Sequence, residues 1–209
     1  MQVRSQALFR GLPAALVLLA AWSWQPSAAL SQGQGAGERR PARHYYDGGS
    51  RREVIEESGE VAEFAPQEET RKQIQAARKE AREVAHRQER FVRLWKVPPE
   101  PEENVVRALS LRAPRGKFSP VFRDSPGGAR RALVGGVLVA LDPSWSEKQV
   151  KEWARGHGYA IGAKLPTAKR TYLLDTPPGL PSLEEANKLQ ESGEVVSATP
   201  NWWQEVQAK

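Results

Sequence analysis

Two stretches of the chain resemble each other, and this internal repeat constrains the fold more than any other feature. Residues 47–66 read DGGSRREVIEESGEVAEFAP and residues 124–143 read DSPGGARRALVGGVLVALDP, so that their closing prolines lie 77 positions apart. Further along, VPPEP at 97–101 recurs as TPPGLP at 176–181. Several anchors at nearly one offset indicate an internal duplication. We therefore expect the same order of strands and helices twice.

The second copy shows its elements more clearly. We expect a strand at 136–143, a helix at 146–158, strands at 159–166 and 170–177, a helix at 182–192 and a strand at 194–202. Ser146 with Gln149, and Ser182 with Glu185, have the spacing of capping boxes, and Gly193 is placed to end the second helix.

The order β-α-β-β-α-β in about 70 residues matches a ferredoxin-like sandwich, with both helices on one face of a four-stranded antiparallel sheet and the other face open. The first copy is less regular, because residues 67–90 have the charged, helix-favouring pattern of one long helix. The sequence predicts an α+β protein with two tandem ferredoxin-like units, residues 44–124 and 125–203, of which the first is degenerate.

One apolar cluster is expected to form the core of the second unit. Its predicted members are Val137, Val139, Leu141, Val150, Trp153, Leu173, Leu183, Ala186, Leu189 and Val195. These residues follow the strand and helix periodicities of their segments.

The first 29 residues have the pattern of a signal peptide. Arg4 and Arg10 precede an apolar run at 11–22, and Ser27 and Ala29 are small residues at the spacing that signal peptidases accept. We expect cleavage after Ala29 and export to the periplasm or the medium; an uncleaved anchor is the alternative, although the run is shorter than the roughly 20 residues of a spanning helix. Residues 30–43 are expected to be a flexible leader.

Composition excludes several classes of protein. The chain has no cysteine, which rules out a lipid-modified lipoprotein and a disulfide framework. Its net charge is +6, of which about +4 remains without Arg4 and Arg10, and the basic residues are interleaved with glutamate. Nucleic-acid binding is therefore not expected, and neither is a stable membrane anchor after signal cleavage.

Catalytic patterns are not found in the sequence. The only histidines are His44, His86 and His157, and none has a serine motif of the kind that nucleophilic catalysis needs. No His/Asp/Glu group has metal-ligand spacing, and the glycines of GGARRALVGG fit no phosphate-binding or dinucleotide-binding motif. We expect a protein without enzymatic activity, cofactor or metal.

The end of the second copy resembles a known family. In LEEANKLQESGEVVSATPNWW a helix is followed by a Gly-x-Val turn at Gly193 and Val195, and then by a strand ending in Pro200, Asn201 and Trp202. This pattern is similar to the end of the propeptide of subtilisin-like serine proteases, and YYDGGSRREVI and FSPVFRDSPGG resemble the N-terminal region of long bacterial propeptides of this family. The catalytic domain of the family has no counterpart in this chain.

The resemblance implies a partner and a mode of binding. Propeptides of this family pack their sheet on the protease, and the chain after the last strand enters the substrate cleft. The implied function is binding of a subtilisin-like protease in trans, as inhibitor or folding helper. The expected contacts are Trp202, Trp203, Val206, Gln207, Ala208 and Lys209. The alternatives are an exported protein-interaction domain with no protease partner, or a detached fragment of a subtilase precursor.

Overall fold

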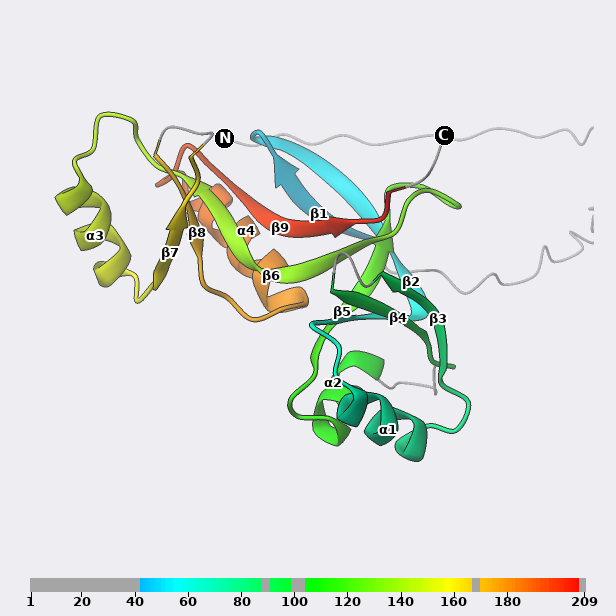
Figure 1. The fold of residues 1–209 in the computed structure, drawn as a ribbon. Helices are drawn as coiled ribbons and strands as arrows, with labels where there is room; N and C mark the ends of the chain where they lie inside the picture. The colour runs from blue at the N-terminus through cyan, green and yellow to red at the C-terminus, as the bar shows by residue number, and fades with distance from the viewer. Residues whose placement is uncertain (1–41, 88–90, 99–103, 167–169, 207–209) are drawn as a thin grey trace, which may run out of the picture. The chain divides into compact units, whose positions relative to one another are not determined.

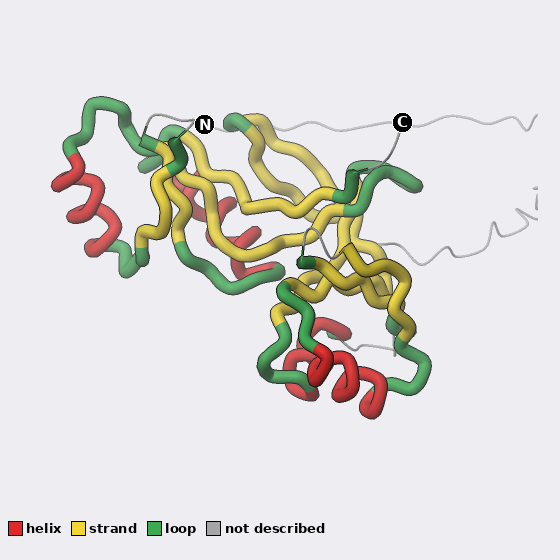
Figure 2. Tube along the Cα trace, in the orientation of Figure 1, coloured by secondary structure: helices red, strands yellow, loops and turns green. Residues whose placement is uncertain are grey.

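The computed structural model describes residues 42–87, 91–98, 104–166 and 170–206. Within these residues, nine strands join one antiparallel sheet and four helices pack on it (Figures 1 and 2). The expected signal peptide, residues 1–29, and residues 30–41 of the expected leader lie outside the described part. Strand β1 (Ala42–Asp47) begins two residues inside the range expected for the leader.

The chain after β1 consists of two successive sets of elements with the same order. The first half comprises β2 (Ser50–Phe64), α1 (Glu68–Ala77), β3 (Arg82–Arg87), β4 (Val92–Lys96), α2 (Val105–Arg112) and β5 (Lys117–Arg123). The second half comprises β6 (Arg131–Ala140), α3 (Glu147–Gly156), β7 (Ile161–Lys164), β8 (Thr171–Leu174), α4 (Leu180–Ser192) and β9 (Ser197–Gln204). Both halves therefore follow strand, helix, strand, strand, helix, strand.

The sheet runs through both halves. Its order is β3-β4-β2-β5-β6-β8-β7, with β1 paired to the start of β2 and β9 paired to β6. Strand β5 joins the halves, because it pairs with β2 on one side and with the first residues of β6 on the other. The sheet curls, which brings β1 against β9 and α4.

Strand register supports the repeat in more detail than the sequence does. In the first half Val61 pairs with Trp95 on one side and Pro120 on the other. In the second half Val137 pairs in the same way with Leu174 and Pro200, so Val61 and Val137 are the central residues of equivalent rows. In both halves the register shifts just before this row, next to Gly59 (φ 69°) and Gly136 (φ 85°). Glycine adopts such positive φ values without a Cβ clash, so it suits a bulge in each copy.

The long helix expected over residues 67–90 is wrong. Helix α1 ends at Ala77, Arg78 leaves the helical region with φ −136° and ψ 88°, and β3 follows and pairs with β4. The lysines, arginines and glutamates that favour a helix also suit an edge strand, where charges are well solvated and discourage further pairing. Backbone pairing with β4 and burial of Ala81 outweigh the local helix preference.

Helix ends agree with the sequence at two of three places. Ser146 and Gln149 form the capping box of α3, and Gly193 ends α4 with φ 72°. The second capping box is wrong, because α4 begins earlier, at Leu180, with Gly179 as its N-cap. The Ser182 hydroxyl instead donates to the Gly179 carbonyl at 2.9 Å.

The predicted core of the second half is mostly confirmed. Seven of the predicted residues form one buried cluster with Tyr172, Leu174 and Ala198, namely Val137, Val139, Leu141, Val150, Ala186, Leu189 and Val195. Trp153 is partly buried against this cluster, and Leu183 is buried in another. Leu173 is wrong: it is half-buried on the opposite face, because Tyr172 and Leu174 are the residues of β8 that point toward the helices.

Replacing Leu189 with alanine is expected to lower the free energy of unfolding by about 2–5 kcal/mol, because a cavity would remain in this cluster. Leu189 is 3% exposed. Urea unfolding of the variant measures the change, and Lys188→Ala, an exposed position of the same helix, is the control. A loss below about 1 kcal/mol for Leu189→Ala would contradict its placement in the core.

Candidate functional site: an open sheet face

The first half has a buried cluster on each face of its sheet. Helices α1 and α2 cover one face, where Ile74 and Leu109 meet Trp95. The other face is filled by a second cluster, which joins residues of the first half to two residues of the second. Its members are Ala62, Phe64, Val92, Leu94, Val121, Ala132 and Trp203. Thus the curl of the sheet closes a face that the helices leave free.

The second half leaves the corresponding face uncovered by any described segment. The six residues on it are all half-buried, and none is charged; they are Leu138, Ala140, Thr171, Leu173, Ser197 and Thr199. We call these six residues the open face. Three of the six are apolar, Leu138, Ala140 and Leu173, and the other three carry hydroxyl groups. An uncharged surface of this kind that no described segment covers is a candidate site for binding another protein.

A hollow of about 640 Å³ lies next to the open face. Leu173 belongs both to the hollow and to the open face, and Gly136 and Gly162 contribute backbone to its wall. Val134 also lines it, and this valine packs at the same time against the filled cluster of the first half. The volume lies within the range of sites that bind small molecules or side chains.

The two predicted tryptophan contacts are packed within the chain. Trp203 is 6% exposed and belongs to the cluster that fills the face of the first half. The half-buried Trp202 lies edge-on to Tyr45 and Phe122, with ring centroids 5.2 and 5.6 Å away. The Arg131 guanidinium lies 5.9 Å from the Trp202 ring. Both indoles therefore contribute to packing.

The C-terminal segment leaves the sheet from an anchored position. The Glu205 amide donates to the Arg130 carbonyl at 2.8 Å, and its carboxylate lies 3.4 Å from the Arg130 guanidinium. Arg130 also pairs with Glu60 at 2.9 Å. Val206 is 66% exposed, and the predicted contacts Gln207, Ala208 and Lys209 lie outside the described residues.

Two neighbouring arginines recur in the two copies, at residues 51–52 and 130–131, and the equivalent hairpins that carry them have different surroundings. Arg51 and Arg52 are exposed. Arg131, by contrast, lies 3.0 Å from Asp124 and donates to the Tyr45 hydroxyl at 2.7 Å. Only the pair in the second copy therefore takes part in the junction between the halves.

Two of the three histidines have described side chains, and each lies beside a glutamate. His44 Nε2 is 3.2 Å from Glu191, and His157 Nε2 is 2.8 Å from Glu194. The side chain of His86 lies outside the described part. Among the described residues, no three His, Cys, Asp or Glu side chains are grouped to hold a metal ion. None of the helices in the described ranges is long and apolar enough to cross a membrane.

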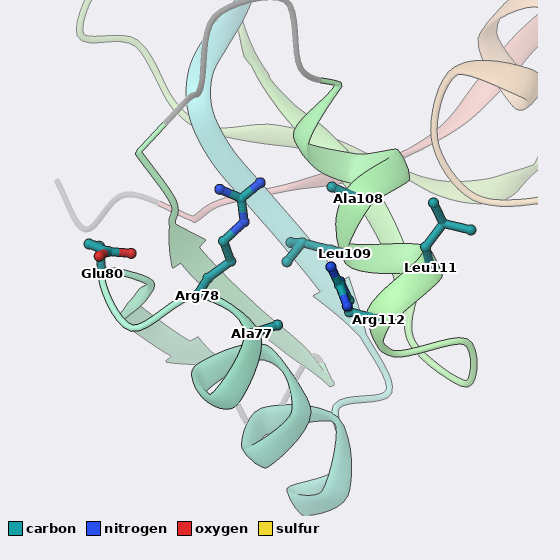
Figure 3. Close-up of a pocket in the computed structure, with 7 residues that line it drawn as sticks. All are labelled: Ala77, Arg78, Glu80, Ala108, Leu109, Leu111 and Arg112. Atoms are coloured by element: carbon teal, nitrogen blue, oxygen red, sulfur yellow. The ribbon is translucent and has the colours of Figure 1, made fainter.

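A second hollow, of about 490 Å³, lies between α1 and α2 (Figure 3). Arg78 follows the end of α1 and Arg112 ends α2, while Glu80 lies on the loop after α1. Leu111 on its rim is 74% exposed. Because charges of both signs surround this hollow, it has no clear preference for an anion or a cation.

A buried ion pair lies beneath α1. Glu63 and Arg93 are 1% and 5% exposed, and the Arg93 Nη1 atom is 3.5 Å from Glu63 Oε2. The Trp95 indole also donates to this carboxylate, at 2.9 Å. Burial raises the pKa of Glu63, although the Trp95 hydrogen bond and the Arg93 charge act against the shift. The pair joins β2 to β4 below the first helix.

No sequence motif marks the open-face residues as a candidate site. Leu173 was predicted to lie in the core and Leu138 was not singled out, because both belong to apolar runs in which alternation cannot show which side chains face the helices. The feature that identifies this face is the pairing of Leu138 with the hydroxyl-bearing Thr199 in the structure. That pairing needs the register, which the sequence alone does not provide.

The chain was compared with known proteins at three levels. It matches no protein-family model, no curated protein and no solved structure.

Proposed function

We propose that each half is a ferredoxin-like unit, so that the chain carries two in tandem. The strand order supports this proposal: β3-β4-β2-β5 in the first half and β7-β8-β6-β9 in the second, all antiparallel, are the same arrangement. In each half two helices pack on one face. This arrangement matches that of a split β-α-β sandwich.

The function that these features support best is binding of a subtilisin-like serine protease in trans, as inhibitor or folding helper. The observation that carries the proposal is the uncharged open face of the second half, which no described segment covers. The resemblance of residues 193–202 to the end of subtilase propeptides supplies the class of partner. The N-terminal pattern of a signal peptide agrees with a function outside the cytoplasm.

Two parts of the chain have different roles in the proposed complex. The open face docks on the protease surface by uncharged contacts, through its three apolar and three hydroxyl-bearing side chains. The segment after Glu205 then extends into the substrate cleft, where main-chain pairing supplies most of the affinity. The anchoring of Glu205 by Arg130 supports this division, because it holds the start of the segment in place.

Inhibition of a panel of subtilisin-like proteases tests the proposal. We expect the chain without residues 1–29 to inhibit at least one member. Truncation after Glu205 removes Val206 and the following residues but retains the Arg130 contacts, and is expected to weaken inhibition by about tenfold or more. Leu138→Glu is expected to weaken it similarly, because it places a charge on the open face.

Leu111→Glu is the matched control, since Leu111 is an exposed leucine on α2 far along the chain from the open face. It should inhibit like the unaltered protein. Refolding of each denatured protease with and without the protein tests the folding-helper role. If the protein neither inhibits nor assists any protease of the panel, the proposal fails and an exported interaction domain with another partner is favoured.

A further inference from the structure

The register of the two halves identifies which residues of the open face have counterparts in the filled face. One row across the first half consists of Leu94, Ala62 and Ser119, and the corresponding row across the second consists of Leu173, Leu138 and Thr199. Each row lies one residue beyond the central residues Val61 and Val137. The same surface is therefore present twice, once covered and once free.

The first copy of this surface shows what such a face accommodates. Leu94 and Ala62 are buried in one cluster with Ala132 and Trp203, which come from β6 and β9. Ser119 accepts a hydrogen bond from the Leu133 amide at 2.9 Å, so a backbone segment lies against it as well. The occupant is thus a pair of extended segments that carry one indole and one small side chain.

The second copy has room for a similar occupant. The hollow of about 640 Å³ is lined by Leu173, the counterpart of Leu94. Two glycines beside Leu173 add no side chain to the hollow. A Cβ on Gly162 would come 3.0 Å from the Leu173 carbonyl oxygen, and a Cβ on Gly136 would come 2.6 Å from the Leu173 side chain, so a larger residue at either position would crowd Leu173. An aromatic ring buried here would gain contacts like those of Trp203.

We propose that the open face and its hollow bind an aromatic side chain presented by an extended, uncharged segment of the partner protein. This inference rests on the proposed function, and it assigns the aromatic residue to the surface of the protease. The open face agrees with such an occupant, because none of its six residues could pair with a charge that docking removes from water. The hollow itself has one charged residue of each sign in its lining, Lys117 and Asp175. Strand β9, whose Trp203 packs on the equivalent surface of the first half, shows what kind of partner segment we expect.

A synthetic peptide with the sequence of residues 199–204, acetyl-TPNWWQ-amide, is the probe. Titrated into the full chain, it is expected to shift the methyl NMR signals of Leu138 and Leu173 while leaving those of Leu94 unchanged, because that position is already filled. The peptide acetyl-TPNSSQ-amide, which lacks both indoles, should bind at least tenfold more weakly. Leu173→Glu should abolish binding of the first peptide and Leu111→Glu should not.

Thr199→Lys is a second blocking variant, for use if circular dichroism shows that Leu173→Glu does not fold. Equal shifts with both peptides, or none at Leu138 and Leu173, would overturn the inference. The two proposals can fail separately: a chain that inhibits a protease equally well with Leu173→Glu or Thr199→Lys still binds the protease, but it does not dock through the open face, and this site is lost. A chain that binds the peptide and inhibits nothing retains the site and loses the protease as partner.

Discussion

Replacing Trp203 with alanine is expected to lower the free energy of unfolding by about 3–5 kcal/mol, the range observed for large aromatic residues removed from a core. The indole is 6% exposed and fills the face of the first half together with Leu94 and Phe64. Its removal leaves a cavity between strands that belong to different halves. Urea unfolding, followed by circular dichroism, gives the change.

Trp145→Ala is the matched control, because Trp145 is only partly buried at the edge of the other cluster. It should lose less stability than Trp203→Ala. The Trp203 variant is also expected to bind a hydrophobic dye more strongly, since it uncovers part of the first face. If its stability falls by less than about 1 kcal/mol, Trp203 does not fill that face.

Replacing Arg93 with methionine is expected to cost about 3–5 kcal/mol at neutral pH, because it leaves the Glu63 carboxylate buried without its cation. Both partners are nearly inaccessible to water, and Arg93 also donates to the Gln67 carbonyl at 3.3 Å. The double variant Glu63→Gln/Arg93→Met is expected to recover a large part of the loss, because no charge then remains buried. If the double variant recovers stability, the loss in Arg93→Met comes from the unpaired buried charge of Glu63; if it does not, the loss comes from packing.

The pH dependence of the Arg93 variant follows from the raised pKa of Glu63. A carboxyl whose pKa is higher in the folded than in the unfolded state favours folding when protonated, so this group stabilises the fold as the pH decreases through its folded-state pKa. The positive charge of Arg93 lowers the pKa of Glu63, so its removal raises this pKa further. The stability of the variant should therefore depend on pH more strongly than that of the unaltered protein. Unfolding measured at successively lower pH, starting from neutral, should show the deficit shrinking as Glu63 becomes protonated. A deficit that is constant, or that persists in the double variant, would contradict this account.

Local signals in the sequence predicted the parts of the fold that local physics determines. The Ser146 capping box and the Gly193 helix end are correct because each depends on a few neighbouring residues. The order of elements in the second half was predicted from the strand and helix patterns of its own sequence. These predictions required no knowledge of which strands pair.

The errors arise where distant segments compete with local preference. Residues 82–87 have helix-favouring side chains, but they form a strand because their backbone pairs with that of β4. Leu173 points away from the helices because the register of β6 and β8 sets its side. The filling of the first face by Trp203 depends on a strand far along the chain, which no periodicity within the first half could indicate.

The candidate site was predicted only in outline. An open sheet face followed from the β-α-β-β-α-β order, but the sequence could not show that one of the two such faces is occupied by the chain itself. Trp202 and Trp203 were natural choices for partner contacts, and both are packed within the chain. Leu138 and Leu173 remain on the surface in their place.

The filling of the first face by Trp203 also has a consequence for biosynthesis. A ribosome releases Ala62 and Leu94 long before Trp203, so the first half emerges with an apolar surface whose cover has not yet been made. Partly folded chains with such surfaces are prone to aggregate. The first half therefore cannot complete its folding before β9 has emerged from the ribosome.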